Sequence, residues 1–139
     1  MPTPTVFVDH VPYASGYVIS EANHDRSRDT LLLAAGEKVV AGQVLGADSA
    51  SGELKGRDAT AGDGSEVAVA ISYRDVDNSA GALPVQIVVH SRDMEANEQL
   101  VSLVDSATLP ADKDSAITEL AAVGIILRAA DVAAKVFPL

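Results

Sequence analysis

Residues 84–89 read Pro-Val-Gln-Ile-Val-Val and decide the fold class of this chain. The segment is rich in β-branched residues, and proline is tolerated at the first position of a strand. A second segment, 67–72, reads Val-Ala-Val-Ala-Ile-Ser and alternates with period two, which predicts a strand whose valines and isoleucine face the core. The sequence therefore predicts a protein built mainly from β-strands.

Shorter pieces before these two segments extend the β prediction. Strands are expected at 30–33, 38–40, 43–45 and 53–55, the first of them buried. Gly36 and Gly42 predict tight turns between these strands. Residues 48–65 are rich in Gly, Asp, Ser and Ala and predict a surface loop around the strand at 53–55.

One helix is predicted near the C-terminus. Asp112 or Asp114 can cap it after Pro110, where a carboxylate also favours the positive end of the helix dipole. Its apolar stripe is Ile117, Leu120, Ala121 and Gly124. Gly124 should end the helix, and 125–127 should follow as a strand. Residues 94–104 are compatible with helix or strand. The predicted fold class is mainly β with one or two short helices (α+β).

Residues 1–26 differ in character from the rest. Pro2, Pro4 and Pro12 favour extended backbone, and 6–8 and 17–19 lean towards β structure. A strand-prone segment with too few apolar residues to fold alone is expected to be an extended arm that pairs with a partner. The alternative is a floppy terminus of no consequence. The predicted organisation is an arm at 1–26, a domain at 27–128 and a tail at 129–139, which could be helical.

Composition limits the functions open to the chain. Its 139 residues are 47% apolar but only 4% aromatic, so the core should be thin and oligomerisation should add stability. A net charge of −10, with no cluster of Lys and Arg, argues against binding nucleic acid. No cysteine, signal peptide or apolar run of about 18 residues is present, so we expect a soluble protein made in a cytoplasm, with no membrane partner.

No motif for catalysis or metal binding stands out. The histidines, His10, His24 and His90, are far apart and interpreted as surface residues. Ser27, Ser65 and Ser91 lack a nucleophile elbow. The run 75–81 resembles a calcium loop only faintly, since Ala80 stands where glycine is needed and Gln86 where glutamate is needed, so a polar turn is predicted. We expect no enzymatic activity, no metal, no cofactor and no small-molecule substrate.

Three groups of residues, in order along 13–128, resemble the family of lambda-like phage head decoration proteins. They are Gly16-Tyr-Val-Ile-Ser-Glu-Ala-Asn23 with Arg26-Ser-Arg-Asp-Thr-Leu-Leu-Leu-Ala-Ala-Gly36, then Val40-Ala-Gly-Gln-Val-Leu-Gly46, then Asp63-Gly-Ser-Glu66, Asp75-Val-Asp77, Val85–Val89 and Ala121-Ala-Val-Gly-Ile-Ile-Leu-Arg128. Their order and spacing carry the resemblance. The chain departs from the family pattern at 52–55, at 90–97 and in the tail after Arg128.

The resemblance implies a small β-barrel-like, β-tulip decoration domain and a virion protein on the outer capsid surface, made in a bacterial host. It implies a homotrimer that sits on three-fold and quasi-three-fold sites of the expanded head. There it would act as a cement against the pressure of packaged DNA. The arm would pair with strands of the major capsid protein. The expected capsid-binding residues are Tyr13, Gly16, Tyr17, Val18, Ile19 and Ser20.

Two other functions stay open at this point. One is a different β interaction module, from a phage tail or a bacterial surface layer, also without enzymatic activity. The other is a small enzyme or ligand-binding barrel, which would need a concave pocket with converging polar groups.

Overall fold

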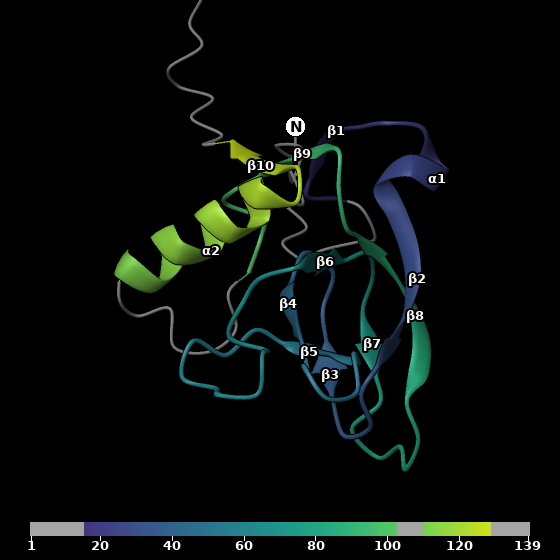
Figure 1. Cartoon of the computed structure of the whole chain (residues 1–139). Coiled ribbons are helices and arrows are strands. Elements are labelled where there is room, and N and C mark those ends of the chain that lie inside the picture. Colours follow the sequence, from purple (N-terminus) through teal and green to yellow (C-terminus); the bar gives the residue numbers. More distant parts are fainter. Residues whose placement is uncertain (1–15, 103–109, 129–139) are drawn as a thin grey trace, which may run out of the picture.

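The structure is a computed structural model that describes residues 16–102 and 110–128 (Figure 1). Its elements in chain order are β1 (Val18–Glu21), α1 (His24–Ser27), β2 (Arg28–Leu33), β3 (Lys38–Val39), β4 (Val44–Ala47), β5 (Leu54–Gly56), β6 (Ala70–Ser72), β7 (Val76–Asp77), β8 (Val85–His90), β9 (Met94–Asn97), α2 (Pro110–Ala122) and β10 (Ile125–Arg128). The described part is therefore mainly β with two helices, which confirms the predicted fold class.

A small closed barrel forms the first layer, with strand order β2-β5-β4-β6-β8. Strands β2 and β8 pair antiparallel over six residues, from Arg28 opposite His90 to Leu33 opposite Val85. The barrel core consists of Leu33, Val39, Leu45, Leu54, Ala70, Ile87 and Val89. A short ribbon of β3 and β7 extends from the barrel.

A three-stranded sheet with order β1-β9-β10 forms the second layer, together with α2, at one end of the barrel (Figure 1). Strand β9 pairs antiparallel with β1 and parallel with β10. The two layers enclose a second core of Tyr17, Val44, Ala68, Ile71, Met94, Ala96, Ala116, Leu120 and Ile125. Val44 and Ile71 belong to barrel strands, so this core joins the sheet to the barrel.

Most predicted strands are present. The segments predicted at 38–40, 43–45, 53–55 and 84–89 correspond to β3, β4, β5 and β8, and 125–127 lies within β10. The segment 94–104, which the sequence left open between helix and strand, begins with strand β9. Gly36 and Gly42 take φ values of 85° and 83°, as tight turns require. The tail at 129–139 lies outside the described residues.

Two burial predictions were wrong. In β2 only Leu33 is buried, whereas Leu31 and Leu32 are 38% and 43% exposed. In 67–72 the predicted alternation also fails, because Val67 is 45% exposed while Ala68, Ala70, Ile71 and Ser72 are all buried. The reason is that β6 lies between the two cores: Ala70 belongs to the barrel core, and Ala68 and Ile71 to the second one.

Helix α2 begins earlier than predicted. It starts at Pro110, so Asp112 lies in its first turn and neither Asp112 nor Asp114 is its cap. Of the predicted stripe only Leu120 is fully buried, and it packs with Ala116 four residues earlier. Gly124 ends the helix as predicted, with φ of 89°, and its N–H donates to the carbonyl of Ala121 over 3.0 Å.

Candidate functional site

Strand β1 is an edge strand that directly follows the N-terminal segment. It pairs with β9 on one side, and within the described ranges no strand pairs with its other side. An edge strand presents backbone N–H and C=O groups that another chain can pair with. The root of the predicted arm is thus a site where a partner strand could be added.

A β-bulge shapes this edge. Val18 lies opposite Ala96 and Ser20 opposite Glu95, so Ile19 is the extra residue of β1. Val18 packs against the second core, whereas the Ile19 side chain is 50% exposed. In a regular strand Tyr17 and Ile19 would share one face, because successive side chains alternate. The bulge breaks that alternation, and Ile19 is exposed while Tyr17 is buried.

Tyr17 fastens the start of β1 to the barrel. Its side chain is 2% exposed, and its carbonyl accepts a hydrogen bond from the Asn97 N–H over 2.8 Å. Its hydroxyl lies 2.5 Å from Nδ1 of His90, the last residue of β8. Gly42 makes room for the ring: a Cβ there would lie 3.3 Å from the Tyr17 ring and 2.6 Å from the Leu100 carbonyl oxygen.

His90 links Tyr17, the residue before β1, to the carboxylate of Glu21 at the end of β1. The imidazole is fully buried, and its Nε2 lies 2.6 Å from Oε2 of Glu21. Burial lowers the pKa of His90, which outweighs the opposing effect of Glu21. Because Glu21 accepts the proton of Nε2, the neutral ring has Nδ1 free to accept, and the Tyr17 hydroxyl donates to it. Burial also raises the pKa of that hydroxyl.

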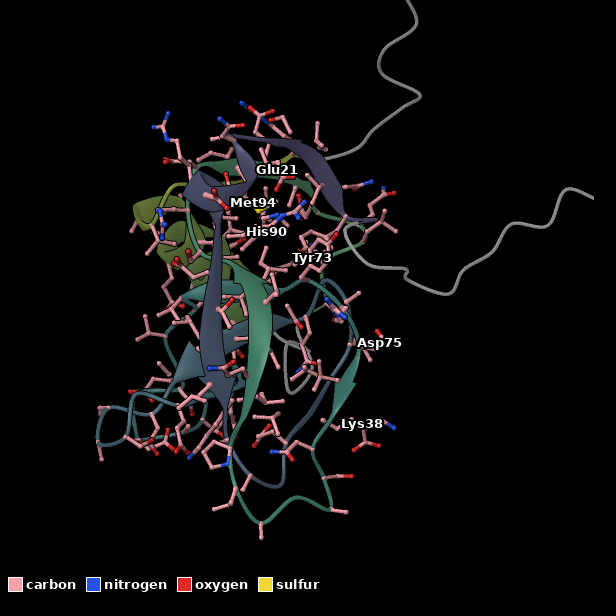
Figure 2. The ribbon with its side chains drawn as sticks, turned by 90° about the vertical axis from the view of Figure 1, so that its right-hand side faces the viewer. Glu21, Lys38, Tyr73, Asp75, His90 and Met94 are labelled. Atoms are coloured by element: carbon pink, nitrogen blue, oxygen red, sulfur yellow. The ribbon has the colours of Figure 1, made fainter. Side chains whose placement is uncertain are left out.

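Arg28 completes the cluster from β2. Its Nε and one terminal nitrogen contact the two oxygens of Glu21 at 3.1 and 2.6 Å. Burial raises the pKa of Glu21, but the hydrogen bonds from Arg28 and His90 outweigh it and leave that pKa below its usual value. The guanidinium also stacks 4.5 Å from the ring centre of Tyr73. Glu21, His90 and Tyr73 gather at the end of the barrel below β1 (Figure 2). We call Tyr17, Glu21, Arg28, Tyr73 and His90 the His90 cluster.

Ser27 makes a second fastening next to the His90 cluster. Its hydroxyl is fully buried, accepts from the Ala22 N–H over 3.0 Å and donates to the Asp93 carbonyl over 2.8 Å. The same carbonyl accepts directly from Ala22 over 3.1 Å. These bonds hold the turn that carries the chain from β1 into α1.

The structure separates the predicted capsid-binding residues into three groups. Tyr13 lies outside the described residues. Gly16, Tyr17 and Val18 are partly or fully buried against the domain, whereas Ile19 and Ser20 are exposed. Residues 16–26, which the sequence assigned to the arm, include β1 and most of α1. Strand β1 already pairs with β9, because Tyr17 and Glu21 find buried partners on the barrel.

The candidate catalytic groups have structural partners. The hydroxyl of Ser65 donates to Asp63 and that of Ser91 to Asp29, both over 2.5 Å. In the run 75–81, Asp77 accepts from Ser79 within a polar turn, as predicted. Among residues 16–102 and 110–128, no three His, Cys, Asp or Glu side chains gather as a metal site would require. No helix in these ranges is long and apolar enough to cross a membrane.

A shallow groove lies on α2. It has a volume of about 340 Å³ and is lined by Asp114, Ser115, Thr118 and Glu119. These side chains come from a single face of one helix, so polar groups from different elements do not converge there as in a ligand pocket.

The role of His90 is what the sequence interpretation missed. The sequence suggested a surface histidine after a strand, but the ring lies between the barrel and the second layer with 0% exposure. The sequence did contain one indication of this cluster. The first group of residues that resembles the family includes Tyr17, Glu21, Ser27 and Arg28. The most recognisable part of the sequence is therefore the part that fastens β1.

Comparison with known proteins agrees with this architecture. The family described as bacteriophage lambda head decoration protein D matches residues 8–125, which is most of the chain. No curated protein matches the chain significantly. The matched region covers β1, the His90 cluster, the whole barrel and most of the second layer. The chain belongs to the bacteriophage lambda head decoration protein D family.

Proposed function

We propose that this protein binds the outside of an expanded phage head as a homotrimer and cements it, by non-covalent contacts alone, against the pressure of packaged DNA. The observation that carries the proposal is the outer edge of β1, with which no strand among residues 16–102 and 110–128 pairs and which lies at the root of the N-terminal segment. Residues 1–15 together with this edge form the capsid-binding arm, and the major capsid protein supplies the strand that pairs with it.

Binding by strand addition suits the exposed groups of β1. Main-chain hydrogen bonds would supply affinity, and exposed side chains such as Ile19 would supply specificity. Fixing the backbone of a peptide segment on binding costs on the order of 1 kcal/mol per residue, so we expect one arm alone to bind weakly. Three arms on one trimer make the second and third contacts intramolecular, which raises avidity by roughly 10² to 10⁴.

The His90 cluster supports this function because it fixes the position of β1 relative to the barrel. Tyr17 directly precedes β1 and Glu21 is its last residue, and both are hydrogen-bonded to His90. A force that a partner strand exerts on β1 is therefore transmitted to the barrel through these hydrogen bonds. Force on the shell is transmitted into the folded domain.

The test is a truncation that spares β1. Deleting residues 1–15 leaves Tyr17 in place, so the variant should keep the melting temperature of the full chain. It should lose co-sedimentation with expanded heads that lack their own decoration protein. Binding at full strength by the truncated protein would overturn the arm proposal. A variant with residues 1–15 scrambled controls for chain length, and it should also fail to bind.

A further inference from the structure

The barrel is closed at only one point between β2 and β5. Strand β2 pairs with β8 over all six of its residues but with β5 only at Leu33, opposite Leu54. The bond from the Ala34 N–H to the Leu54 carbonyl, 2.9 Å long, lies at the same point. From Arg28 to Leu32, β2 thus has one strand neighbour among the described residues, and its other edge is free.

The backbone groups on this edge can be assigned. Ser91 donates to the Ser27 carbonyl over 3.0 Å, which makes 27 and 91 a hydrogen-bonded pair. Bonded and non-bonded pairs alternate along an antiparallel ladder, so Thr30 and Val88 form a non-bonded pair. The Val88 carbonyl indeed accepts from Tyr73 on the other side, over 3.1 Å. The N–H and C=O of Thr30 therefore point to the free edge.

Two consecutive side chains on this edge, Leu31 and Leu32, are apolar and exposed, one on each face of the strand. Leu31 and Leu33 lie on the same face of β2, because they are two residues apart. Leu33 is fully buried, whereas Leu31 is 38% exposed because β5 does not pair with β2 at Leu31. Leu32, on the opposite face, is 43% exposed. Single exposed leucines are ordinary, but two consecutive ones on a free strand edge form a surface suited to pairing.

The edge also lacks the charges that usually protect such strands. Proteins commonly guard an exposed edge with a free charged side chain, often lysine. Here Arg28 is bound to Glu21, and Asp29 is bound to Arg92 and Ser91. Between Thr30 and Leu32 the strand carries no charge. An unprotected edge of this kind is expected to be covered in the working protein.

Its position shows which partner fits. Strand β2 starts next to α1, at the end that carries β1, and runs from there down the flank of the barrel (Figures 1 and 2). If the β1 end, which carries the proposed capsid-binding arm, faces the head, this flank faces sideways. A neighbouring copy on the same three-fold site lies sideways, whereas the capsid surface does not.

We propose that the free edge of β2, residues 28–32, is the contact by which neighbouring copies of this chain join. The inference rests on the proposed trimer and names its interface. In a three-fold ring each subunit contacts the next through two different surfaces. The β2 edge is one of them, and the neighbour adds backbone hydrogen bonds at Thr30 and covers Leu31 and Leu32.

The experiment compares Leu32→Lys with a matched control, Ile126→Lys. Ile126 is 37% exposed and lies on β10, away from β2. Sedimentation velocity at micromolar concentration should give a trimer for the full wild-type chain and for Ile126→Lys. Leu32→Lys should already dissociate at concentrations about tenfold or more above those at which the wild-type trimer dissociates, since burying an unpaired charge in an apolar contact is unfavourable. Its circular dichroism spectrum should stay that of a folded barrel.

Amide exchange keeps the test decisive if Leu32→Lys fails to fold. In the wild-type trimer the Thr30 amide should exchange slowly, and it should exchange fast after dilution to monomer, while the Leu31 amide, bonded to β8, should change little. Fast exchange at Thr30 in the trimer would overturn the inference.

The outcomes also separate this inference from the proposed function. A wild-type monomer would overturn both the trimer and its interface. A wild-type trimer with unchanged assembly of Leu32→Lys would leave the trimer standing and overturn the β2 interface. A Leu32→Lys trimer that no longer binds heads would place the edge against the capsid, which also overturns it.

Discussion

The Tyr17 hydroxyl donates a hydrogen bond to Nδ1 of His90 over 2.5 Å, across 73 positions of sequence. The two rings also meet edge to face, with centres 5.5 Å apart. This contact joins the residue before β1 to the last residue of β8, and so connects the second layer to the barrel. The root of the proposed arm has a defined position because both groups are buried and each satisfies the other.

Removing the Tyr17 hydroxyl should destabilise the protein without unfolding it. Tyr17→Phe keeps the ring but leaves Nδ1 of His90 buried without a donor, which costs about 1–3 kcal/mol. The free energy of unfolding from urea titration measures the loss. Tyr73→Phe is the matched control, since the Tyr73 ring contacts Arg28 and His90 while its hydroxyl has no hydrogen bond to any described residue. It should change stability by less than about 0.5 kcal/mol, and equal losses in the two variants would contradict the assignment.

Stability should fall as the pH is lowered, and His90 should account for part of that fall. The pKa of His90 is below 6.5 in the folded protein, so the unfolded chain takes up the proton first. The stabilisation is fully present above pH 6.5 and is lost as the pH falls below it. Glu21, whose pKa is also lowered, adds a further loss below pH 4.5.

Replacing the histidine isolates its contribution. His90→Gln lacks the titrating ring, so its free energy of unfolding should depend less on pH between 7 and 5 than that of the wild type. Carboxylates such as Asp29, whose pKa is lowered from 3.8, titrate at lower pH and are shared by both proteins. Parallel curves for the two proteins over this range would show that His90 does not titrate as described.

Gly46 should not tolerate a side chain. A Cβ there would lie 2.1 Å from the Ser65 carbonyl oxygen, a backbone atom that cannot swing aside. Gly46→Ala should therefore lower stability by about 1–3 kcal/mol, through overpacking between β4 and the loop that returns to it. Gly62→Ala is the control, because nothing lies within 4 Å of its Cβ position. Differential scanning calorimetry should show a lower melting temperature for the first variant only.

Ile19 should contribute to binding and little to folding. Its side chain is half exposed at the bulge of β1, so Ile19→Asp should change stability by about 0.5 kcal/mol or less. The affinity of the Ile19→Asp variant for expanded heads, measured by co-sedimentation, should fall clearly, because the substitution places a charge in the proposed strand contact. Val123→Asp, a change at a 36% exposed residue between α2 and β10, should bind like the wild type. If both variants bind equally well, β1 is not the contact.

Local sequence determined most of the strands and turns. Runs of β-branched residues specify β8, and turn glycines such as Gly36 and Gly42 separate the short strands around them, because these preferences act over a few residues. The motif that contains Tyr17, Glu21 and Arg28 identified the family. It also contains most of the His90 cluster, although sequence alone gave no reason to connect these residues.

Burial and partnership were decided by tertiary structure. Whether Val67 or Ala68 is buried depends on what packs against β6 from each side, and two different cores do so. His90 became a buried link because β1 and the second layer cover the end of its strand, 69 positions from Glu21. Leu31 stayed exposed because β5 leaves β2 after one residue pair. Sequence patterns encode what each segment prefers by itself, whereas the faces that are covered depend on segments distant along the chain.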